Sequence, residues 1–230
     1  MFEEEAKGLQ LLAATASFRI PKVIGVGEVT PYCYLLLEYI DSAPKASDFW
    51  ESFGCQLAQL HKTTNPFFGL DSDNYIGSLP QYNSCKITDV SQFYIEKRLE
   101  PQFKLATENG FSFKALSAFY KNITREIPNE VPALIHGDLW NGNYLVDDTG
   151  NACLIDPAVA FAPREMDLAM MRLFGGFPDS VFTTYTTAFP LEKGWKNRVE
   201  LWQLYYLLVH LNLFGSSYYN SVNTIVKKYS

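Results

Sequence analysis

The sequence has no hydrophobic run long enough to cross a membrane and few residues of the types that bind structural metals. Its four cysteines include no C-x-x-C pair and it has only three histidines, which excludes the common zinc-finger arrangements. Three of the cysteines lie in apolar patterns, so we expect them to be small core residues. The 47% hydrophobic and 15% aromatic residues are typical of a globular protein.

Basic residues are also scarce. Lys and Arg number 19 against 25 Asp and Glu, which gives a formal net charge of −6, whereas proteins that bind nucleic acid usually carry a basic surplus. Three of the first five residues are glutamates, which makes the N-terminus acidic, the opposite of a secretion signal. We therefore expect neither nucleic acid nor a membrane as a partner, and we expect a cytoplasmic location. The oligomeric state is not indicated.

The most informative segment is H-G-D-L-W-N-G-N at residues 136–143, followed by a buried-strand pattern at 152–155 and then by Asp156. Asn143 follows Asp138 five residues later, the spacing at which kinases place an Asp beside the substrate hydroxyl and an Asn on Mg²⁺. Asp156 can supply a further oxygen ligand of the kind that Mg²⁺ prefers. A polar turn with Asp156 as a cap is the structural alternative, but the whole combination favours phosphoryl transfer.

Hydrophobic periodicity predicts a short strand-bearing part followed by a longer, mainly helical part. A helix is expected over residues 2–12, then two strands over 23–27 and 33–40. Asp48, with a Glu three residues later, resembles a capping box that opens a helix, and an irregular insert follows over 65–88. Further helices are expected over residues 90–108, 113–126, 164–174, 180–188 and 195–214.

Taken together, these residues resemble the fructosamine kinase (ketosamine-3-kinase) family, a branch of the protein-kinase-like fold that also includes aminoglycoside and choline phosphotransferases. The resemblance extends over nearly the whole chain, and the D-N-Y-I-G…P-Q-Y-N insert with H-G-D-L-W-N-G-N points to this branch in particular. The segments that carry it are residues 1–9, 57–61, 68–77, 80–83, 98–101, 136–143, 156–159 and 164–170.

The resemblance implies an α+β, protein-kinase-like two-lobe fold. Residues 1–40 would be a remnant of a truncated N-terminal strand lobe, which binds nucleotide, and residues 41–230 the mainly helical C-terminal catalytic lobe. It also implies ATP-dependent phosphorylation of the 3-hydroxyl of ketosamines, which are free or protein-bound sugar adducts of amines. ATP and Mg²⁺ would then be the cofactors, and a ketosamine the partner.

The same resemblance assigns roles to individual residues. Glu5 would pair with a lysine of the nucleotide lobe, and Asp167 would hold the catalytic loop from below. His136 is expected to be structural. The expected site consists of Asp138 as catalytic base; Asn143 and Asp156 as Mg²⁺ ligands and nucleotide contacts; Glu38, Tyr39 and Ile40 as the adenine-binding hinge; and Trp140 and Asn141 as substrate contacts, with simple packing the alternative for Trp140.

One feature of the family is not found in this sequence. Family members carry three further strands before the helix that begins here, with a glycine-containing loop and a lysine that hold the phosphates. Lys7 and Lys22 lie on the wrong elements to replace that lysine. We therefore expect a truncated, weakly active or inactive kinase. A phosphotransferase for an aminoglycoside or choline, and a non-catalytic kinase-like binding protein, stay open as alternatives.

Overall fold

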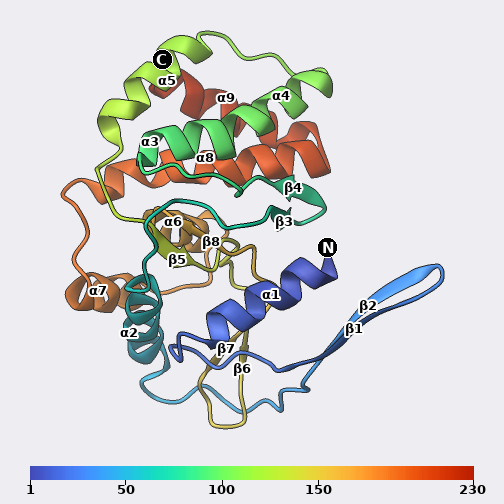
Figure 1. Ribbon diagram of the computed structural model, residues 1–230. Helices are drawn as coiled ribbons and strands as arrows, with labels where there is room; N and C mark the ends of the chain where they lie inside the picture. The colour runs from blue at the N-terminus through green and yellow to red at the C-terminus, as the bar shows by residue number, and fades with distance from the viewer.

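The structure is a computed structural model that describes residues 1–230 (Figure 1). Its elements are α1 (Phe2–Ala13), β1 (Val23–Val29), β2 (Tyr32–Leu37), α2 (Phe49–His61), β3 (Asn74–Ile76), β4 (Leu79–Gln81), α3 (Val90–Phe93), the π-helix η1 (Tyr94–Leu99), α4 (Glu100–Glu108), α5 (Leu116–Glu126), β5 (Ala133–Ile135), β6 (Tyr144–Val146), β7 (Ala152–Leu154), β8 (Ala160–Ala162), α6 (Glu165–Leu173), α7 (Asp179–Ala188), α8 (Trp195–Phe214), the 3₁₀ turn η2 (Ser216–Tyr218) and α9 (Tyr219–Lys228).

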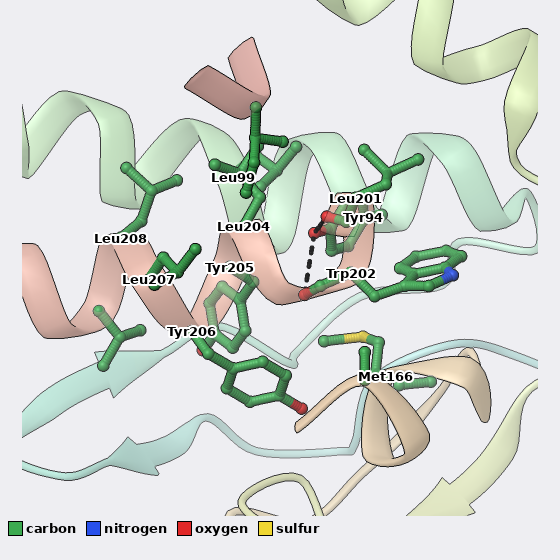
Figure 2. Packing of buried hydrophobic residues seen from close by; sticks show 14 of the residues in the cluster. Tyr94, Leu99, Met166, Leu201, Trp202, Leu204, Tyr205, Tyr206, Leu207 and Leu208 are labelled. Carbon is green, nitrogen blue, oxygen red and sulfur yellow. Dashed lines mark hydrogen bonds between the residues drawn. The ribbon is translucent and has the colours of Figure 1, made fainter. Parts of the chain in front are cut away.

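Two hydrophobic clusters hold the molecule together. The larger lies around α8, which packs against α4, α6 and α9, and the smaller lies around α2, which packs against α7 (Figure 1). Figure 2 shows part of the larger cluster, where side chains of α8 interleave with residues of η1 and α6. Apolar residues on every side of α8 explain why it is buried almost all round.

The strands form four separate antiparallel pairs. One pair positions the H-G-D segment relative to the segment that carries Asp156. β5 pairs with β8, so that Ile135 lies opposite Ala160. The chain between them runs through the H-G-D loop, the β6–β7 hairpin and Asp156. Because β5 and β8 are paired, the two ends of this connecting segment lie next to each other, and residues 136–138 lie against residues 156–158.

The β1–β2 hairpin extends away from the rest of the molecule in Figure 1. It pairs with no other strand, so both of its edges are free of strand partners. Its side chains include several large exposed apolar groups, namely Ile24, Val26, Val29, Tyr32, Tyr34 and Leu36. The division of the chain at residue 40 into two lobes stays a prediction.

Most expected elements are confirmed, with shifts of a few residues at their ends, but some expectations were wrong or incomplete. The insert at 65–88 contains the β3–β4 hairpin, and α9 and the β5–β8 pair were missed. Asp48 precedes α2 but caps no backbone N–H; its carboxylate accepts from Ser52 Oγ at 3.1 Å instead. Of the cysteines only Cys153 is buried, because Cys33 lies on the uncovered hairpin and Cys55 faces solvent.

None of the helices combines the length and the apolar character that a bilayer span requires.

Candidate active site

A buried carboxylate fixes the H-G-D loop to the helical part of the molecule. Asp167, on α6 and fully buried, accepts hydrogen bonds from the backbone N–H groups of His136 at 2.8 Å and Gly137 at 2.9 Å. Its Oδ2 also lies 3.2 Å from His61 Nε2, while His61 Nδ1 lies 2.8 Å from the hydroxyl of Tyr185. Asp167 therefore lies where the resemblance predicted, beneath the loop.

His136 belongs to this support rather than to a ligand site. It is fully buried, and its Nε2 donates to the carbonyl of Ile155 at 3.0 Å. Its Nδ1 accepts from the backbone N–H of Asp138 at 3.3 Å, which makes Nε2 the protonated nitrogen. Burial lowers the pKa of His136, so the ring is neutral. Through its two hydrogen bonds the ring connects the H-G-D loop to the segment that precedes Asp156.

Asn143 holds the three motif residues together. Its Nδ2 donates to the carbonyl of Asp138 at 2.9 Å, to Asp138 Oδ2 at 3.1 Å and to the carbonyl of Asp156 at 3.2 Å. Asp156 adopts φ +52°, a left-handed conformation that non-glycine residues rarely take and that clusters at functional sites. The structure thus brings together Asp138, Asn143 and Asp156 from separate segments.

The Asp138 carboxyl lies in an environment that favours a base. Burial, and next the negative charge of Asp156, raise the pKa of Asp138 to about 7, and the bond from Asn143 opposes this only partly. A group that takes up a proton near neutral pH is suited to general base catalysis. Part of this rise in pKa comes from repulsion between the Asp138 and Asp156 carboxylates, which therefore lie close enough to interact.

Two cavities meet at these carboxylates. One, of about 290 Å³, opens toward α1 and is lined by Glu5, Asn74 and Tyr75. The other, of about 540 Å³, opens toward α8 and has mainly apolar walls. Asp138 and Asp156 line both, so a group bound in one cavity can meet a group bound in the other at the Asp138 carboxylate.

The residues present fit a divalent cation bound together with phosphates. The Asp156 carboxylate is exposed, and no group of the chain donates to Asn143 Oδ1. The carboxylate and the amide oxygen are therefore both available as metal ligands. No cluster of three or more His, Cys, Asp or Glu side chains is positioned to bind a metal alone. A hard cation that takes its other ligands from phosphates and water matches this small donor set.

Glu5 lies on α1 beside this site, half-buried and in no ion pair with a basic residue of the chain. Burial, followed by the charge of Asp156, raises the pKa of Glu5. The side chain therefore faces the smaller cavity as an acidic group whose charged form is disfavoured.

The three residues that the sequence predicts to form the hinge do not line either cavity. The Glu38 carboxylate is occupied within the chain, since Oε2 accepts from the N–H of Lys22 at 3.1 Å and Oε1 from Arg19 at 3.2 Å. These bonds hold the pKa of Glu38 below its usual range. Tyr39 is exposed and Ile40 buried, and the backbone of neither makes a hydrogen bond within the chain, which leaves it available to a ligand.

Trp140 and Asn141 line the larger cavity, next to Asp138. The Trp140 ring is 38% exposed and lies over Gly142, where an added Cβ would be 2.3 Å from it, and its ring centroid is 6.4 Å from that of Phe174. One face of the ring is therefore packed, and part of its surface remains open to the cavity.

A buried polar network that sequence reasoning missed connects the insert to the Asp156 segment. Asn74 Nδ2 donates to the carbonyl of Val159 at 2.9 Å, and Gln81 Nε2 donates to that of Ala158 at 3.0 Å. Gln81 and Asn83 both donate to Asn74 Oδ1. The only sequence signal was the run of amides in the insert. The network fixes the segment that carries Asp156, which gives Asn74 a structural role.

Gly137 gives a direct test of how closely the loop packs. It has φ +85°, and an added Cβ would lie 1.9 Å from the carbonyl oxygen of Ala158. We expect Gly137→Ala to lower the free energy of unfolding by about 3 kcal/mol through backbone strain and displacement of the loop. Gly110→Ala is the control, because Gly110 also has a positive φ, +92°, but no atom lies within 4 Å of an added Cβ. Backbone strain alone should lower its free energy of unfolding by about 1 kcal/mol. If urea unfolding gave the same loss of stability for Gly137→Ala and Gly110→Ala, the close contact between Gly137 and Ala158 would be contradicted.

Comparison with known proteins identifies the family. The sequence model described as "Fructosamine kinase" matches residues 1–230. A protein of Enterococcus faecium named "Probable ketoamine kinase" is 41% identical over 234 residues, which covers 99% of this chain and 82% of that protein. The chain belongs to the fructosamine kinase family. Another family member, "Protein-ribulosamine 3-kinase, chloroplastic" of Arabidopsis thaliana, is 36% identical over a match that covers all of this chain and 72% of that protein.

Solved structures agree with membership of the fructosamine kinase family. A crystal structure described as a "putative fructosamine-3-kinase" from Thermobifida fusca superposes with a TM-score of 0.89 and 36% identity, covering 99% of this chain and 79% of that one. An aminoglycoside phosphotransferase solved with ADP and hygromycin B has a TM-score of 0.59 at 16% identity, which shows the fold alone. The chain is thus a kinase-family protein with the mixed helix and strand, protein-kinase-like fold that its sequence predicted.

Proposed function

We propose that the chain transfers the γ-phosphoryl group of ATP to the 3-hydroxyl of a ketosamine. The observation that carries this proposal is the meeting of two cavities at Asp138 and Asp156, in a chain whose relatives are named ketoamine and ribulosamine kinases. The triphosphate end of ATP would occupy the smaller cavity, with adenine at the free backbone of Tyr39 and Ile40. The sugar would occupy the larger cavity, against Trp140 and Asn141.

In this mechanism Asp138 orients the acceptor hydroxyl and accepts its proton as the oxygen attacks phosphorus. Its raised pKa keeps it basic enough to take that proton near pH 7. Asn143 keeps the Asp138 carboxylate in place through the 3.1 Å bond. Asn143 Oδ1 and Asp156 would hold a divalent cation, for which we propose Mg²⁺; when bound, it neutralises charge on the phosphates.

The larger cavity favours a ketosamine over a polycationic aminoglycoside. Its walls are mainly apolar, and its only acids are Asp138 and Asp156, which the mechanism already uses. A polycationic aminoglycoside would need further carboxylates to neutralise its amines. A ketosamine instead offers sugar hydroxyls and an amine substituent with apolar carbon.

The test is ADP release by the purified chain with ATP, Mg²⁺ and fructoselysine. We expect release that depends on the ketosamine and is lost with EDTA, and no release with a 3-deoxy analogue as the matched control. Hygromycin B and choline serve as competing acceptors, and release with either but not with ketosamines would contradict the proposal. The low turnover expected from the sequence stays a prediction, and the same assay measures it; the cytoplasmic location also stays a prediction.

A further inference from the structure

The hydroxyl of Tyr206 on α8 is a buried polar group without a partner in the chain. Tyr206 is 1% exposed, and its Oη is one of two buried side-chain polar atoms that form no hydrogen bond, the other being Arg172 Nε. An unsatisfied buried hydroxyl is destabilising, so such groups are rare and call for an explanation.

The neighbouring buried tyrosines are satisfied. Tyr94 donates to the carbonyl of Leu201 at 2.6 Å, and Tyr205 donates to Gln81 Oε1 at 2.9 Å. In Figure 2 a dashed line joins Tyr94 to α8, and the Tyr206 ring extends from α8 toward α6. The Tyr206 hydroxyl forms no hydrogen bond with any group of the chain. The missing partner is therefore particular to Tyr206 and not a general property of this core.

The position of Tyr206 shows where a partner can come from. Tyr206 lines the 540 Å³ cavity together with Asp138 and Trp140. Most other walls of this cavity are apolar, including Met170 and Val209. In such a cavity the few polar groups decide which ligand binds and how it is oriented.

Tyr206 can act as a hydrogen-bond donor throughout the pH range in which the protein is folded. Burial, followed by the charges of Asp167 and Asp138, raises its pKa well above the usual value, so the phenol keeps its proton. One turn further along α8, His210 donates from Nδ1 to the carbonyl of Tyr206 at 2.8 Å and keeps Nε2 as an acceptor. Tyr206 and His210, one turn apart on α8, thus both line the same cavity.

We infer that Tyr206 donates a hydrogen bond to a hydroxyl oxygen of the acceptor sugar and helps to determine which acceptors the cavity takes. The inference rests on the proposed function, because it places the sugar in the larger cavity. It extends that function by adding a specificity-determining residue remote in sequence from the H-G-D motif.

The test compares Tyr206→Phe with the unsubstituted chain by titration calorimetry, with fructoselysine and ATP as separate ligands. Loss of one hydrogen bond should weaken fructoselysine binding about tenfold and leave ATP binding unchanged. The melting temperature should stay equal or rise, because the substitution removes an unsatisfied hydroxyl. Tyr205→Phe is the matched control: it breaks the bond to Gln81, so it should lower the melting temperature.

A series of fructoselysine analogues, each without one sugar hydroxyl, identifies the group that Tyr206 contacts. The analogue without that hydroxyl should bind the unsubstituted chain about tenfold more weakly than fructoselysine does. It should bind Tyr206→Phe no more weakly than fructoselysine, because the interaction is already gone.

The outcomes separate this inference from the proposed function. If fructoselysine binds both chains equally, the inference is overturned, and the Tyr206 hydroxyl holds a buried water. The inference is also overturned if the Phe variant loses ATP binding or melts at a lower temperature, since Tyr206 is then structural. If the unsubstituted chain binds hygromycin B or choline but no ketosamine, the proposed function fails and the comparison is made with that acceptor. If no acceptor binds, both fail.

Discussion

Replacing Asp138 by Asn is expected to abolish phosphoryl transfer and, at the same time, to make the fold more stable at neutral and alkaline pH. Asn is nearly the same shape and keeps an oxygen to accept the bond from Asn143. It cannot accept the proton of the substrate hydroxyl. Loss of a general base lowers kcat by roughly 10²–10⁴-fold, which brings turnover of this chain to background.

The gain in stability follows from the pKa of Asp138, which rises from 3.8 to about 7 on folding. The folded state therefore binds a proton more tightly than the unfolded state. The free energy of unfolding falls as the pH rises from about 4 to about 7, and above pH 7 the full destabilisation remains. Because the side chain is only partly shielded from solvent, we take the effect as about 1 kcal/mol, or roughly 2–4 °C in melting temperature.

Melting temperatures of both chains, measured with EDTA across pH 4 to 8, test this prediction. The difference in favour of Asp138→Asn should be close to zero at pH 4 and should grow until about pH 7. Asp71→Asn is the control, because Asp71 is exposed and its side chain makes no hydrogen bond. A constant difference across the pH range would show that the Asp138 carboxyl does not titrate as described. Undiminished ADP release would remove Asp138 from the mechanism.

The long helices were predictable because their apolar positions repeat over several turns. Residues 195–214 have apolar residues at steps of three or four over the longest such stretch, and α8 has these same ends. β5 and β8 were missed because each has three residues, all or nearly all buried, which is too short for an alternating pattern. Their pairing depends on contacts between distant segments, which periodicity does not report.

The H-G-D-x₄-N spacing predicted that Asp138, Asn143 and Asp156 would lie together, and the structure places them so. Their roles in binding and catalysis stay proposals. The spacing did not indicate the buried amide network around Asn74. Tyr206 lies within the predicted helix at 195–214 and is buried. Periodicity predicts burial, but it gives no information on whether a buried hydroxyl finds a partner.

Replacing Asp167 by Ala should cause the largest loss of stability. The substitution leaves the N–H groups of His136 and Gly137 without an acceptor in a fully buried place, and it removes a partner of His61. Each unsatisfied donor costs about 1–3 kcal/mol, so we expect a loss of about 3–5 kcal/mol. For a chain of this size the melting temperature should fall by roughly 10 °C.

Asp167→Asn separates the need for hydrogen-bond acceptors from the need for bulk. Asn is of nearly equal volume, but its amide N–H₂ would face one of the two backbone N–H groups, which places donor against donor. We therefore expect Asn to be destabilising as well, though less than Ala, which also leaves a cavity. If Asn melted at the wild-type temperature, the side chain would be needed only to fill space.

Asp179→Ala provides the matched surface control. Its carboxylate is 90% exposed and pairs with Arg172 at 3.2 Å, and an exposed pair of this kind contributes about 0–1 kcal/mol. The Asp167 variants should also lose ADP release at temperatures where circular dichroism shows them folded, because a loop without its acceptor no longer holds Asp138 between the two cavities. Folded variants with full activity would mean that the β5–β8 pair alone positions the loop.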